Sequence, residues 1–144
     1  MERHVPGRTR ADRSLLKPAT RDWIRCAEED FEVAAALLRR RGKTPDNTIG
    51  FHCQQCLEKY PKARLEEASL SVPKTHDLVA LLQLLLPLEP LWVSFAPALR
   101  GLNDYAVKFR YPGHIHSCAD VLQAIKDCRG LRKEIRQSLG LPRT

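Results

Sequence analysis

The segment Arg110-Tyr111-Pro112-Gly113-His114-Ile115-His116 places one guanidinium and two imidazoles close together in the chain. Such a group suits phosphodiester cleavage, because arginine stabilises the charge that develops on phosphorus while histidine transfers a proton to or from an oxygen. No metal ion is required when a ribose 2′-hydroxyl is the nucleophile. Arginine and histidine beside a helix end are also ordinary capping and salt-bridge residues, so the segment alone leaves a structural role open.

A second group is Lys74-Thr75-His76-Asp77, which offers Lys74 and His76 as candidate ligand-binding side chains. Thr75 and Asp77 are the residue types that a helix start favours, so the simpler interpretation of this group is structural.

The third group is His52-Cys53-Gln54-Gln55-Cys56. Two cysteines three residues apart on a helix could share a metal ion, but a zinc site needs two further ligands, and the sequence has no second pair with this spacing. Buried thiols are the simpler interpretation, and we predict neither a metal nor a cofactor. Walker A, GxGxxG, HExxH and GxSxG motifs are absent, which argues against the commonest nucleotide-dependent, zinc-protease and hydrolase chemistries.

The chain has 144 residues, a formal net charge of +7 and 43% hydrophobic residues, which is the composition of one globular domain. The charge permits a nucleic-acid or acidic protein partner without requiring one. No apolar run reaches the roughly 18 residues of a membrane helix. The five cysteines are odd in number and lie mostly in helix-like segments, so we predict reduced thiols and a cytoplasmic protein without a membrane partner.

The hydrophobic pattern predicts an all-α, up-and-down bundle of about five helices over residues 20–140, preceded by a basic flexible tail over residues 1–19. The first helix spans about residues 20–41. The second begins at Thr44-Pro45-Asp46 with Thr44 as its cap, and Pro61 predicts a kink or break within it.

Three further helices complete the predicted bundle. The third is capped by Thr75 and ends at Pro87, and the fourth begins near Ser94. The fifth follows the Pro112-Gly113 turn, with Ser117 and Asp120 spaced as in a capping box. The Arg110–His116 segment therefore lies at the junction of the last two helices.

Taken together, several stretches resemble the HEPN family (higher eukaryotes and prokaryotes nucleotide-binding domain). They cover about residues 20–139 and comprise Trp23 with Ala27-Glu28-Glu29-Asp30-Phe31, then Phe51-His52-Cys53-Gln54-Gln55-Cys56-Leu57-Glu58-Lys59, Lys74-Thr75-His76-Asp77-Leu78, and Leu102-Asn103-Asp104-Tyr105 leading to Arg110-Tyr111-Pro112. The resemblance implies a helical bundle that forms a homodimer.

The family includes metal-independent ribonucleases, among them toxins of toxin–antitoxin pairs, whose motif is an arginine, four to six residues and a histidine. Arg110 and His116 match that spacing. Nuclease members usually carry a small polar residue after the arginine, whereas this chain has Tyr111. Cys118 occupies the position at which some members carry a tyrosine that partner nucleotidyltransferases modify.

These features leave two hypotheses. In the first, the protein is a nucleotide- or RNA-binding interaction module that pairs with a small nucleotidyltransferase in a toxin–antitoxin-like system, with Lys74, His76, Tyr111 and His114 as ligand-binding residues. In the second, it is a metal-independent endoribonuclease in which Arg110 and His116 are catalytic. The sequence alone does not decide whether the protein is an enzyme.

Overall fold

The computed structural model of the chain describes residues 15–40, 42, 45–107 and 116–144. Within these residues the chain forms five α-helices, one 3-10 helix and no strand, so the all-α prediction is confirmed. The elements are α2 (Pro18–Leu38), α3 (Asn47–Glu67), α4 (Leu78–Leu85), η1 (Pro90–Phe95), α5 (Ala96–Val107) and α6 (Cys118–Ser138).

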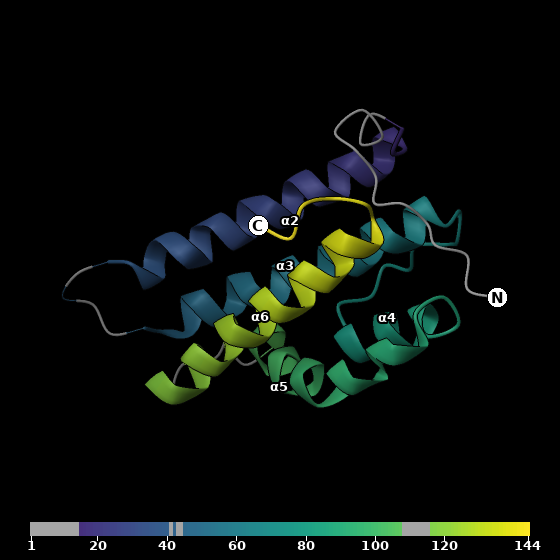
Figure 1. Ribbon diagram of the computed structural model, residues 1–144. Coiled ribbons are helices and arrows are strands. Elements are labelled where there is room, and N and C mark those ends of the chain that lie inside the picture. The colour runs from purple at the N-terminus through teal and green to yellow at the C-terminus, as the bar shows by residue number, and fades with distance from the viewer. Residues whose placement is uncertain (1–14, 41, 43–44, 108–115) are drawn as a thin grey trace.

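Helix α3 is the centre of the bundle and packs against each of the other four α-helices (Figure 1). Helix α2 runs back along one side of α3, and α6 lies along another, while α4 and α5 cover the remaining side (Figure 1). The C-terminal segment turns back over α6, where the Arg136 side chain donates a hydrogen bond to the Pro142 carbonyl. This arrangement buries most of the apolar side chains of α3, while the ends of the outer helices stay at the surface of the bundle.

Helix α3 continues through Pro61 without interruption, so of the predicted kink or break the break is wrong, while the kink stays a prediction. A proline in a helix interior removes one backbone hydrogen bond and costs about 3 kcal/mol. Neighbouring side chains of α3 that are fully buried, such as Leu57, Tyr60 and Ala63, hold the helix against its partners on several sides. Their packing outweighs the local penalty of the proline.

Two helix starts differ from the prediction because an aspartate caps each helix in place of a threonine. Asp46 caps α3 through a bond from the Thr48 backbone N–H, while Thr44 lies outside the described residues. Asp77 caps α4 by accepting from the backbone N–H groups of the second and third residues of the helix, Val79 and Ala80. Aspartate accepts these bonds and also carries the negative charge that a helix N-terminus stabilises.

The start of α6 agrees with the prediction. Ser117 is the N-cap, its hydroxyl accepts from the Asp120 backbone N–H, and the Asp120 carboxylate accepts from the Ser117 backbone N–H. This reciprocal pair fixes the direction in which α6 leaves the preceding segment.

The folded domain begins earlier than residue 20. Helix α2 starts at Pro18, Leu16 is buried, and the Lys17 backbone N–H donates to the Glu67 carboxylate at the end of α3. Residues 15–19 therefore belong to the bundle, and residues 1–14 of the predicted tail lie outside the described residues.

All five cysteines are free thiols, and Cys53, Cys56 and Cys128 are fully buried in the core. The Cys53 thiol lowers the pKa of Cys128, but the Cys56 thiol and burial outweigh it and raise this pKa well above its usual value. Among the described helices, none has both the length and the apolar character that crossing a bilayer requires.

Candidate functional site

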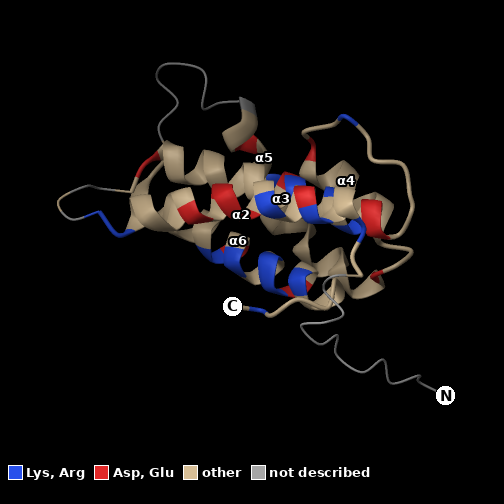
Figure 2. Cartoon of the chain, turned by 90° about the horizontal axis from the view of Figure 1, so that it is seen from above, with Lys and Arg blue, Asp and Glu red and all other residues tan. Residues whose placement is uncertain are grey.

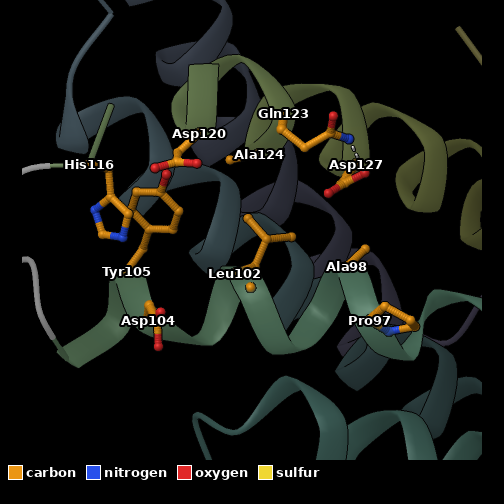
Figure 3. Close-up of a pocket in the computed structure, with 11 residues that line it drawn as sticks. Pro97, Ala98, Leu102, Asp104, Tyr105, His116, Asp120, Gln123, Ala124 and Asp127 are labelled. Atoms are coloured by element: carbon orange, nitrogen blue, oxygen red, sulfur yellow. Dashed lines mark hydrogen bonds between the residues drawn. The ribbon is translucent and has the colours of Figure 1, made fainter. Parts of the chain in front are cut away.

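His116 lies at the junction of three helices, immediately before the cap of α6. Its ring stacks on the ring of Tyr105 near the end of α5, with centroids 4.0 Å apart and planes inclined by 26° (Figure 3). The third helix is α3, whose first residue, Asn47, contacts His116 through two hydrogen bonds. The side chain is partly buried, so the imidazole is held in place and still reaches solvent.

The two bonds to Asn47 define the protonation of the imidazole. The His116 backbone N–H donates to Asn47 Oδ1 over 3.1 Å, which identifies this atom as the oxygen of the amide. The same oxygen lies 3.1 Å from His116 Nδ1, so in the neutral ring Nδ1 carries the proton and donates it. Nε2 is then the atom with a free lone pair, available to accept a proton or a hydrogen bond from a ligand.

Tyr105 reaches this position because residue 50 of α3 is a glycine. A Cβ atom at Gly50 would lie 2.1 Å from Cε1 of the Tyr105 ring, which is far inside van der Waals contact. The ring therefore lies directly on the α3 backbone, and His116 in turn lies on the ring. Gly50 is thus a structural requirement of the site.

The Tyr105 hydroxyl is a buried polar group without a hydrogen-bond partner among the described residues, although the side chain is only 3% exposed. Burial raises the pKa of Tyr105 to about 12, and the nearby negative charge of Asp120 adds to this effect. Buried polar groups in native proteins are nearly always bonded, so a partner for this hydroxyl has to come from outside the described residues.

Two pockets open on either side of His116. One, of about 340 Å³, lies between α5 and α6 and has Tyr105 and Asp120 in its wall (Figure 3). The other, of about 610 Å³, lies where α3 and α6 begin, and its lining includes Asn47 and Ser117. His116 is the residue common to both linings.

Exposed cations gather on the outer face of α6 (Figure 2). Lys126, Arg129 and Lys133 are exposed, recur at helical spacing and have no ion-pair partner among the described residues. We call these three residues the α6 basic stripe. Arg132 and Arg136 on the same helix are different, because both are bonded to the Glu28 carboxylate of α2.

Of the site residues predicted from the sequence, His116 is in the described part of the chain and lies in the site. Arg110, Tyr111 and His114 lie outside the described residues, so their approach to His116 stays a prediction.

Lys74 and His76 lie in the segment before α4, and neither lines the two pockets at His116. His76 Nδ1 is 2.7 Å from Glu58 Oε1, and the His76 carbonyl accepts a bond from Gln54. These contacts fasten the connection between α3 and α4. A ligand-binding role for Lys74 and His76 stays a prediction.

Within the described residues, no group of three or more His, Cys, Asp or Glu side chains is arranged to hold a metal ion. Cys53 and Cys56 are both fully buried, which fits the interpretation of this pair as core thiols.

Residues 20–138 match the family model described as the HEPN domain. The chain belongs to the HEPN domain family. The match covers the helical region from α2 to the end of α6 except for the first two residues of α2, and it confirms the resemblance that the sequence segments suggested. No curated protein and no solved structure matches this HEPN domain.

Sequence reasoning missed the site roles of Asn47, Gly50 and Tyr105. The sequence indicates Tyr105 only as part of the Leu102–Tyr105 stretch that resembles the family, and no local signal relates it to Asn47 and Gly50 on another helix. Asn47 gave no local signal, because its side chain contacts His116, which lies 69 residues later in the chain.

Proposed function

We propose that this HEPN domain is a nucleotide- or RNA-binding interaction module whose ligand phosphates bind beside His116. The observation that carries the proposal is the oriented imidazole, held by Asn47 and Tyr105, whose Nε2 has no hydrogen-bond partner among the residues that the structure describes. Membership of a family of nucleotide- and RNA-related domains supports the same ligand class.

The pocket at the start of α3 and α6 is the side of His116 suited to an anion. The N-terminal ends of α3 and α6 meet there, and each contributes the positive end of its helix dipole, although the α3 cap Asp46 also places one carboxylate in the lining. The Ser117 hydroxyl lies in the same lining. A phosphate in this pocket would lie next to the imidazole.

The α6 basic stripe supports a ligand longer than one nucleotide. Lys126 and Lys133 are seven residues apart, which corresponds to about 10 Å along the helix. Three unpaired cations over this length fit successive phosphates of a single-stranded backbone.

Binding of a fluorescently labelled single-stranded RNA, followed by anisotropy over a range of salt concentrations, tests the proposal. Replacement of all three stripe residues by alanine should weaken binding and reduce the salt slope by about 2, the value for three lost phosphate contacts. A matched control replaces three exposed arginines elsewhere, Arg39, Arg40 and Arg100, and removes the same charge. Equal losses in both variants, or no RNA binding by the wild type, would overturn the assignment.

We further propose that the module forms a homodimer and pairs with a small nucleotidyltransferase encoded beside it, as in a toxin–antitoxin system. Light scattering of the purified protein measures the dimer. Co-purification of both untagged products from one transcript measures the pairing, and a stable monomer that retains no such partner would contradict this part.

The second candidate function is metal-independent RNA cleavage by Arg110 and His116. The tautomer of His116 favours it, because Nε2 of the neutral ring can take the proton of a ribose 2′-hydroxyl. Arg110 would then stabilise the charge on the phosphorus oxygens.

The test is RNA cleavage in the presence of EDTA by the wild type and by Arg110→Ala and His116→Ala. Both variants should lose the activity, while His52→Ala should keep it, because His52 lines neither pocket at His116 and is bonded to Asp30 of α2. Cleavage that survives in both active-site variants would come from a contaminant, and absence of cleavage by the wild type leaves the binding function.

A further inference from the structure

The pocket between α5 and α6 differs in charge from the rest of this basic protein. Three carboxylates, those of Asp104, Asp120 and Asp127, line it, and its described lining contains no lysine or arginine. The whole chain carries a formal net charge of +7, so this acidic lining is a local feature. Three carboxylates would repel a phosphate here more strongly than the single carboxylate of Asp46 does in the pocket on the other side of His116.

The two carboxylates of α6 lie at opposite ends of the pocket (Figure 3). Asp120 and Asp127 are seven residues apart on one face of the helix, which corresponds to about 10 Å along its axis. Apolar side chains occupy the space between them, with Leu102 on α5 and Ala124 on α6 (Figure 3). The pocket therefore offers a negative charge at each end and an apolar middle.

A second, independent observation points to a ligand at one of these ends. Tyr105 is only 3% exposed, and its hydroxyl has no hydrogen-bond partner among the described residues. Figure 3 shows this hydroxyl turned toward Asp120. A donor that bridges the Asp120 carboxylate and this hydroxyl would satisfy the unbonded oxygen.

We propose that this pocket binds a linear aliphatic polyamine, with one ammonium group between Asp120 and Tyr105 and another at Asp127. Ammonium groups have several N–H donors and no acceptor, which matches a wall of carboxylate, amide and hydroxyl oxygens. The methylene chain between them would contact the apolar middle of the pocket. The inference goes beyond the proposed function, because it concerns a cation in a different pocket.

A ligand with two separated cationic groups fits the two ends of the pocket better than a ligand with one cationic group. A single small cation would use only one end, and a metal ion has no suitable group of three ligands in the described residues. Gln123 occupies the lining between the two aspartates and donates to Asp127 Oδ1 over 2.9 Å, which leaves the second oxygen of that carboxylate for the ligand.

Isothermal titration of the full-length protein with spermidine, in EDTA and without RNA, tests the proposal. The expected result is saturable binding of one equivalent. The monoamine butylamine and the uncharged 1,4-butanediol should bind much more weakly, because each lacks at least one of the two terminal charges.

Two variants test the ends of the pocket. Asp127→Asn should weaken spermidine binding about fivefold, the loss of one exposed ion pair. Tyr105→Phe should weaken it by a similar factor through loss of one hydrogen bond, about 1 kcal/mol or fivefold, while the thermal midpoint of the free protein does not fall. Asp120 is not a suitable variant, since its carboxylate also completes the capping box of α6.

Glu134→Gln is the matched control, because it removes the same charge from the same helix outside this pocket. It should change the affinity by less than about twofold, as expected for a screened distant charge. Equal weakening by Asp127→Asn and Glu134→Gln would show non-specific attraction and overturn the proposal. Absence of saturable binding, or tight binding of butylamine equal to that of spermidine, would overturn it as well.

Discussion

Tyr60 and Tyr105 are both buried in the bundle, yet their hydroxyl groups have opposite environments. The Tyr60 hydroxyl accepts a bond of 3.0 Å from Arg136, which is also bonded to Glu28. The Tyr105 hydroxyl has no partner among the described residues. We call the part of the core around Tyr60 the complete region, because its buried hydroxyl is hydrogen-bonded within the protein. Around Tyr105, the proposed ligand would supply the missing hydrogen bond.

The complete region connects three helices. Glu28 of α2 accepts from Arg132 and Arg136 of α6, and Arg136 reaches Tyr60 of α3. The Arg132 guanidinium also lies over the Phe31 ring, 4.2 Å from its centroid. These contacts fasten the outer helices to α3, whereas Asn47, Tyr105 and His116 hold one imidazole at the edge of two pockets.

The largest expected effect comes from breaking the complete region. Glu28→Ala should lower the free energy of unfolding by about 3 kcal/mol, because it leaves the buried charge of Arg132 without its carboxylate. Urea unfolding measures the change. Glu29→Ala is the control: Glu29 is 64% exposed and bonded only to exposed Arg25, so its loss should cost less than about 0.5 kcal/mol. A small effect at Glu28 would show that the network adds little stability.

The next effect concerns the support of the site. Gly50→Ala should lower the free energy of unfolding by about 2 kcal/mol, because the new Cβ displaces the Tyr105 ring. The nuclear magnetic resonance signals of the His116 ring should shift with it. Gly130→Ala on α6, with no atom within 4 Å of its added Cβ, should instead stabilise the protein by about 1 kcal/mol. Unchanged stability of Gly50→Ala would contradict the close contact.

A direct comparison of the two tyrosines gives a smaller difference. Tyr60→Phe should lower the free energy of unfolding by about 1 kcal/mol, because Arg136 loses an acceptor. Tyr105→Phe should change it by less than about 0.5 kcal/mol in either direction, since no bond is lost. Equal losses in the two variants would mean that the Tyr105 hydroxyl is already bonded in the free protein.

The smallest expected effect is that of the Tyr105 titration on the free energy of unfolding, and it is confined to alkaline pH. Its pKa is raised from 10.0 to about 12 in the fold, so above pH 10 the unfolded chain loses this proton first. Stability should therefore fall as the pH rises from 10 to about 12, and fall less steeply in Tyr105→Phe. Urea unfolding at several alkaline pH values measures the slope, and identical slopes for wild type and variant would contradict the raised pKa.

The sequence was sufficient for features that depend on near neighbours. Ser117 and Asp120 are three residues apart, and their pairing at the start of α6 follows from that spacing. The residues that resemble the HEPN family likewise follow one another along the chain, and the family match confirms them. His116 could be selected as a site residue because it adjoins this start.

Other predictions failed where two residues near a helix start could both act as its cap, or where tertiary packing outweighed a local preference. Thr44 and Thr75 were expected as caps, but an aspartate two residues later caps α3 and α4. Pro61 was expected to interrupt α3, but contacts with the surrounding helices keep it intact. Local preferences are worth about 1 to 3 kcal/mol each, which the burial of a central helix exceeds.

The amino-acid sequence by itself determined that this chain forms helices, roughly where each begins, and which family it resembles, because these properties depend on side-chain periodicity and short-range spacing. Only the tertiary structure decided that Gly50 admits the Tyr105 ring and that Asn47 sets the tautomer of His116. It also decided that, among the described residues, the Tyr60 hydroxyl has a hydrogen-bond partner and the Tyr105 hydroxyl has none. Those outcomes depend on distances between helices far apart in the chain, which no local pattern records.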